Sequence, residues 1–139
     1  MIRFNTEDVS LNLKNKTVLK NWLKGIANEY GFKILELNYI FCSDDYLLNM
    51  NQTYLNHETF TDIITFDLSE YENEIEGDIY ISYDRVEENS IKFNTQKNEL
   101  YRVMAHGLLH LIGFKDKTEK EKEIMREKEN LALSKLIII

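Results

Sequence analysis

Proline is absent from the 139-residue sequence, and glycine occurs only five times. Linkers between domains are usually rich in these residues, so their scarcity predicts that residues 1–139 form one domain. The single cysteine, Cys42, excludes an internal disulfide and is typical of a reducing compartment. The sequence also lacks both an apolar run of the roughly 18–20 residues that span a bilayer and the layout of a secretory signal. We therefore expect a cytoplasmic protein without membrane contacts.

Basic residues are fewer than acidic ones, 17 Lys and Arg against 24 Asp and Glu, so the formal net charge is −7. Proteins that bind nucleic acid over much of their surface are usually basic, because their affinity comes from neutralising phosphates. Any binding of RNA would therefore require a local basic patch or a partner. Lys14, Lys16, Lys20 and Lys24 are spaced so that several share one side of a helix. They form either such a patch or an ordinary solvated helix face.

Hydrophobic periodicity predicts the secondary structure. Alternating or β-rich segments predict strands at residues 2–4, about 33–42, 61–68 and 76–82. Apolar residues three or four apart predict helices over about 15–30, 43–55, 84–93 and 95–112, and in a charged segment after Thr118. Together they indicate an α/β (α+β) fold with a small, mainly parallel four-stranded sheet packed by helices. The order of the strands does not follow from the sequence.

Two histidines four residues apart, His106 and His110, lie in the long helix predicted over 95–112. Residues at this spacing share one side of a helix, with Cβ atoms about 5–6 Å apart, so both imidazoles can reach one ion. Gly113 lets the chain turn back, and Asp116 can then supply a third ligand. Two histidines and a carboxylate would leave the fourth position of a zinc ion open, as in catalytic sites.

Other interpretations of these residues remain open. The histidine pair could be two polar residues at a helix edge, and His57, in a predicted loop, could replace Asp116 as a ligand. A purely structural zinc site usually draws on several cysteines, and this chain has one. In the metalloprotease helix H-E-x-x-H the residue after the first histidine is the glutamate base. Here it is Gly107.

The segment HGLLHLIGFKD, residues 106–116, resembles the motif H-G-x-L-H-L-x-G-[FY]-D-H of the YbeY-type endoribonucleases, or ribosomal-RNA maturation factors. Residues 48–54 and 61–66 resemble the family's L-N-x-x-Y and T-[DN]-V-L-S-F stretches. Residues 77–82 resemble its G-D-I-x-I-S strand. The segments follow in the family's order and spacing, which makes the resemblance far more specific than the histidine pair alone.

The resemblance implies a YbeY-like, zincin-related domain with the metal site on its long central helix. It implies one Zn²⁺ ion, with His106, His110 and Asp116 as its ligands. It also implies cleavage of single-stranded RNA, in rRNA 3′-end maturation and ribosome quality control. The implied partners are precursor rRNA and ribosomal proteins or a GTPase assembly factor. Two alternatives are a ribosome-assembly binding factor with a mainly structural zinc site and a metalloprotease-like hydrolase.

The chain departs from the family pattern at several positions. Asp116 stands at the third histidine, preceded by Lys115 where aspartate is usual. A carboxylate also ligates zinc, although it is a harder donor than imidazole. Leu55 replaces an arginine that could contact phosphate, and Asp67 stands where proline is frequent.

The sequence identifies no catalytic base. Asp116 and Asp78 are the candidates, Asp78 because a neighbouring strand could bring it close to the metal. Arg85 is either a phosphate contact or a surface arginine.

Overall fold

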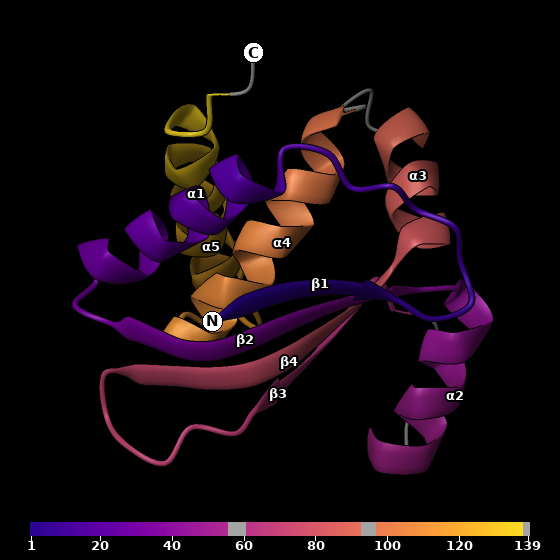
Figure 1. Cartoon of the computed structure of the whole chain (residues 1–139), viewed down its shortest axis with the longest axis horizontal. Coiled ribbons are helices and arrows are strands. Elements are labelled where there is room, and N and C mark those ends of the chain that lie inside the picture. Colours follow the sequence, from indigo (N-terminus) through magenta and orange to yellow (C-terminus); the bar gives the residue numbers. More distant parts are fainter. Residues whose placement is uncertain (56–60, 93–96, 138–139) are drawn as a thin grey trace.

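The computed structural model describes residues 1–55, 61–92 and 97–137 as a four-stranded sheet and five helices in a single domain (Figure 1). In chain order the elements are β1 (Ile2–Thr6), α1 (Lys16–Glu29), β2 (Lys33–Cys42), α2 (Asp44–Leu55), β3 (Ile63–Asp67), β4 (Glu74–Ser82), α3 (Tyr83–Lys92), α4 (Lys97–Ile112) and α5 (Glu119–Ser134). Every strand and helix predicted from the sequence is confirmed. The expected ends at Phe93 and Thr95 lie outside the described residues.

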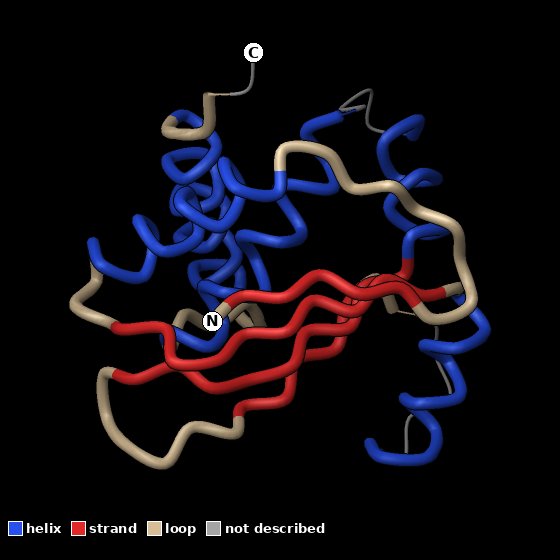
Figure 2. Tube along the Cα trace, in the orientation of Figure 1, coloured by secondary structure: helices blue, strands red, loops and turns tan. Residues whose placement is uncertain are grey.

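The strands lie side by side in the order β1-β2-β4-β3 (Figure 2). β1, β2 and β4 are parallel, and β3 runs antiparallel to β4 at one edge. A mainly parallel sheet is therefore confirmed. The antiparallel edge follows from the short connection between β3 and β4, because neighbouring strands joined without a crossover helix run in opposite directions.

The two faces of the sheet differ in what covers them. Figure 1 shows α1, α3, α4 and α5 on one side of the sheet and α2 at one end of the other side. Alternate residues of β4, such as Ile79 and Ile81, are fully buried in the main core. Their neighbours Asp78 and Tyr80 point to the opposite face, since side chains alternate along a strand. Tyr80 packs there with a second cluster around Leu47 of α2.

Helix α4 is held against the covered face of the sheet. Its residues Met104, Leu108 and Leu109 are fully buried. The hydroxyl of the buried Tyr39 on β2 donates a hydrogen bond of 2.8 Å to the carbonyl of Met104. This hydrogen bond lies two residues before His106 and fixes the middle of the helix relative to the sheet. None of the helices in the described ranges has the length and apolar composition needed to cross a bilayer.

Candidate metal centre

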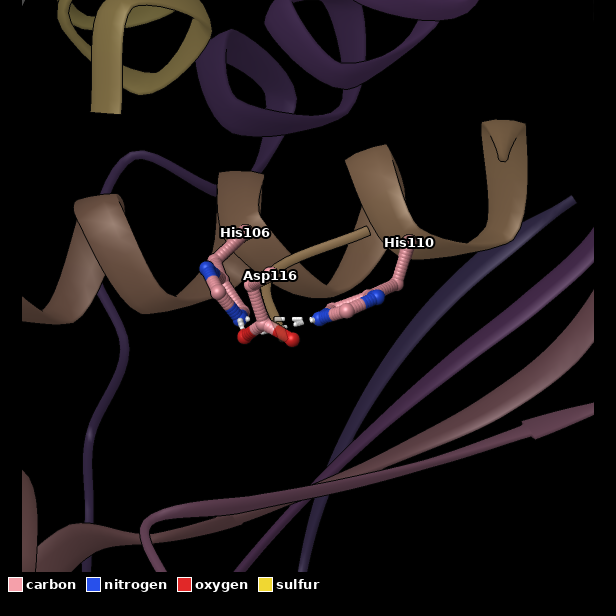
Figure 3. Close-up of side chains that lie close together, drawn as sticks. All are labelled: His106, His110 and Asp116. Carbon is pink, nitrogen blue, oxygen red and sulfur yellow. Dashed lines mark hydrogen bonds and ion pairs between the residues drawn. The ribbon is translucent and has the colours of Figure 1, made fainter. Parts of the chain in front are cut away.

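Three side chains converge beside α4 (Figure 3). The Nε2 atoms of His106 and His110 lie 3.1 Å apart. The Oδ2 atom of Asp116 lies 3.2 Å from the first and 3.3 Å from the second. The structure therefore brings together the three residues that the sequence pattern indicated. Within the described part of the chain, no other group of at least three His, Cys, Asp or Glu side chains has this closeness.

The spacing of these donor atoms suits a zinc ion. Donors about 2.0–2.1 Å from one tetrahedral zinc lie about 3.3–3.4 Å from each other, and the three observed separations are 3.1, 3.2 and 3.3 Å. The side chains keep 20% exposure at His106, 26% at His110 and 38% at Asp116. The group could therefore hold an ion at a position that water and substrate can reach.

Two local motifs place Asp116 opposite the histidines. Gly113 has a φ of 123° and donates a hydrogen bond to the carbonyl of His110 at 3.0 Å, which ends α4 and turns the chain back. Beyond Asp116, α5 begins with the predicted capping box. The Thr118 hydroxyl accepts from the Glu121 amide, and the Glu121 carboxylate accepts from the Thr118 amide. The segment that carries Asp116 is thus fixed at both ends.

Glu129 on α5 belongs to the same site, although it was not predicted from the sequence. Its carboxylate lies 2.6 Å from Nδ1 of His106 and 2.9 Å from Nη1 of Arg102. A carboxylate bound to the outer nitrogen of a histidine selects the tautomer and ring orientation that leave the other nitrogen for a metal. The only signal in the sequence was spacing: Glu129 follows the apolar Met125 by four residues and so lies on the same side of α5. Most other charged residues of this helix are exposed.

The charges around His106 shift two pKa values in opposite directions. Burial lowers the pKa of His106, but the hydrogen bond and charge of Glu129, with the charges of Asp116 and Asp62, outweigh it and raise the pKa above 6.5. Burial raises the pKa of Glu129, but the hydrogen bonds and charges of His106 and Arg102 outweigh it and lower the pKa below 4.5. The charged form of each group therefore favours the charged form of the other.

These shifts predict how the stability of the metal-free protein depends on pH. The raised pKa of His106 contributes stability below pH 6.5 that is lost as pH rises through the folded-state value. The lowered pKa of Glu129 contributes stability above pH 4.5 that is lost on acidification. We expect the free energy of unfolding, measured by urea denaturation, to fall as the pH rises above about 6.5, the ordinary pKa of histidine. Glu129→Gln removes the charge that raises the pKa of His106, so the free energy of unfolding of this variant should depend less steeply on pH. An equally steep dependence in Glu129→Gln would contradict the role assigned to Glu129.

Two other candidates from the sequence, Asp78 and Arg85, take part in other interactions. Asp78 is on the sheet face opposite α4, where its carboxylate accepts a hydrogen bond of 3.0 Å from Asn38, so it is not a base for this centre. Arg85 forms an ion pair with Asp44 at 2.8 Å and thereby joins α3 to α2. His57 lies outside the described residues.

Gly107 faces the sheet. A Cβ atom there would lie 2.9 Å from Cδ1 of Ile63 and 3.0 Å from two atoms of Ile79. The helix position that carries the glutamate base of H-E-x-x-H metalloproteases is thus packed against the core in this protein, without room for a longer side chain. The metalloprotease mechanism is therefore disfavoured by packing as well as by sequence.

Comparisons with known proteins give one consistent result. The family model described as endoribonuclease YbeY matches residues 1–137. A Cytophaga hutchinsonii protein named endoribonuclease YbeY is 56% identical over 134 residues, covering 96% of this chain and 94% of the relative. One from Parabacteroides distasonis is 46% identical, with the same coverage. The solution structure of TM1509 from Thermotoga maritima superposes with a TM-score of 0.68 at 30% identity, covering 98% of this chain and 89% of that one.

Proposed function

Because the chain belongs to the endoribonuclease YbeY family, we propose that it is a zinc-dependent endoribonuclease that cleaves single-stranded RNA. The observation that carries the proposal is the cluster of two imidazole nitrogens and one carboxylate oxygen at separations that suit zinc. The three side chains are partly exposed, which favours a catalytic centre over a closed structural one.

Each residue of the centre has a distinct part in this proposal. His106, His110 and Asp116 hold the ion, which when bound supplies Lewis-acid activation of the phosphodiester and of water. Glu129 keeps the imidazole of His106 oriented through Nδ1. Arg102 neutralises the far oxygen of Glu129, so that the carboxylate remains ionised although it is buried.

We further place the RNA substrate in rRNA 3′-end maturation and ribosome quality control, as the family resemblance implies. The net charge of −7 makes long-range attraction to RNA weak. A ribosomal protein or a GTPase assembly factor that holds the RNA would compensate for this weak attraction. Sedimentation with ribosomal particles, with and without salt washing, tests this association.

Element analysis of the purified protein, followed by a nuclease assay with and without chelator, tests the catalytic proposal. We expect one zinc ion per chain and cleavage of a single-stranded oligoribonucleotide that stops on chelation and returns with zinc. Bound zinc without cleavage would instead support the binding factor with a structural site. Hydrolysis of a peptide in place of RNA would support the metalloprotease-like alternative.

Two substitutions of Asp116 test its place as third ligand. Asp116→Ala leaves two protein donors, so we expect zinc affinity in chelator competition to fall by at least about tenfold. Asp116→His should retain zinc, because imidazole ligates it at a similar distance. Lys115→Ala, in the same turn and exposed, is the matched control. Equal affinities of wild type and Asp116→Ala would exclude Asp116 as a ligand.

A further inference from the structure

A cavity of about 310 Å³ opens directly beside the candidate metal centre. Its volume lies at the lower end of the range for small-ligand sites, about 300–1,000 Å³, which suits a single nucleotide-sized group. It is bounded by His106, Asp116, Lys122, Met125, Arg126 and Glu129. A group in this cavity would therefore touch the donor cluster on one side and α5 on the other.

Helix α5 supplies most of the lining. The lining residues recur every three or four positions along it, so they share one side of the helix. They are Lys122, Met125, Arg126 and Glu129. Met125 and Glu129 are buried and form the inner part, whereas Lys122 and Arg126 are exposed. The cavity thus has an apolar and anionic interior next to the ligands and two cations at its rim.

The carboxylates in the lining are already engaged, and the cations are available. Asp116 lies against the two histidines, and Glu129 is bound by His106 and Arg102. Among the described residues, Lys122 forms an ion pair only with Glu119, at 3.6 Å between two exposed side chains, and such exposed pairs contribute little to stability. In residues 1–55, 61–92 and 97–137, the guanidinium of Arg126 takes part in no hydrogen bond or ion pair.

We propose that this cavity binds a phosphate of the RNA strand adjacent to the cleaved linkage, with Arg126 and Lys122 as positioning residues. The inference rests on the proposed nuclease function and adds to it the place where the RNA strand is held beside the metal centre. A guanidinium presents paired donors that match phosphate oxygens, and an ammonium adds a point charge. The lysines of α1 do not line this cavity. Arg126 and Lys122 are therefore the residues that would supply the local basic patch in a protein with a net charge of −7.

The test uses initial rates of cleavage of a fluorescent single-stranded oligouridylate by the zinc-loaded protein over a series of salt concentrations. We expect Arg126→Gln to raise KM about tenfold, as for loss of one charge-assisted hydrogen bond, with a smaller change in kcat. The slope of log kcat/KM against log salt concentration should become shallower by about 0.7 for each phosphate that is no longer neutralised. Lys122→Gln should also raise KM and make the salt dependence shallower. Arg126→Lys keeps the positive charge, so its KM should lie between those of Arg126→Gln and the wild-type protein.

Two controls separate phosphate binding in the cavity from a general effect of charge and from damage to the metal centre. Lys120→Gln removes the same charge from the same helix outside the cavity and should leave KM and the salt dependence at their wild-type values. Zinc affinity, measured by chelator competition, should be unchanged in Arg126→Gln. A parallel loss of zinc affinity, or a wild-type KM and salt dependence in Arg126→Gln, would overturn the inference while leaving the nuclease proposal intact. Absence of cleavage by the wild-type protein would overturn the nuclease proposal itself.

Discussion

His106→Ala and His110→Ala should each abolish stoichiometric zinc binding in protein that remains folded. Each substitution removes one of the three donor atoms, which lie within 4.8 Å of one another, and two protein ligands hold zinc far less tightly than three. Both imidazoles are partly exposed, so their loss leaves the apolar contacts of α4 unchanged. His106→Ala also removes one partner of the buried Glu129 and should therefore be less stable than His110→Ala. Metal content by element analysis and helical content by circular dichroism measure the two effects separately.

His57→Ala provides the control for the histidine substitutions. His57 is the only other histidine in the sequence, and it was the alternative third ligand. If the centre consists of His106, His110 and Asp116, His57→Ala retains one zinc per chain. A folded His106→Ala protein that still carries one tightly bound zinc would show that the site has been assigned to the wrong residues.

Glu129→Ala should weaken both the fold and the metal centre. The side chain of Glu129 is 8% exposed, and its partners Arg102 and His106 are 17% and 20% exposed. Removing one member of a buried ionic network leaves uncompensated charge, which costs about 3–5 kcal/mol of unfolding free energy. The loss of a hydrogen bond to the outer nitrogen of a metal-binding histidine typically costs roughly 10–100-fold in metal affinity. We expect both losses, by urea denaturation and chelator competition.

Two variants make this expectation specific to the position of Glu129. Glu127→Ala removes an exposed carboxylate from the same helix and should change neither quantity appreciably. Glu129→Gln retains an oxygen that can accept from Nδ1 of His106 but removes the charge, so it should fold more stably than Glu129→Ala. The zinc affinity of Glu127→Ala is the reference value. If Glu129→Gln and Glu129→Ala both bind zinc with this affinity, His106 needs no orienting partner.

The elements and the histidine pair were predictable because they depend on neighbours in the chain. Hydrophobic periodicity identified every strand and helix, and the Thr118 capping box is present as predicted. The spacing of His106 and His110 defines their geometry once they are helical, since residues four apart share one side of any α-helix. Gly113 could likewise be recognised as the helix end, where its positive φ allows the turn towards Asp116. The order and spacing of the motifs also identified the family.

The partners of those residues depended on packing between distant segments. Strand order followed from the assembled sheet, and the register of β4 beside β2 turned Asp78 to the face opposite α4. Glu129 is 23 positions from His106 in the chain, and its carboxylate reaches Nδ1 because α5 folds back along α4. The same packing places Arg126 at the rim of the cavity. Local periodicity determines which side of its own helix a residue occupies, whereas its neighbours across the core depend on the rotation and contact of two helices, which only the packed structure decides.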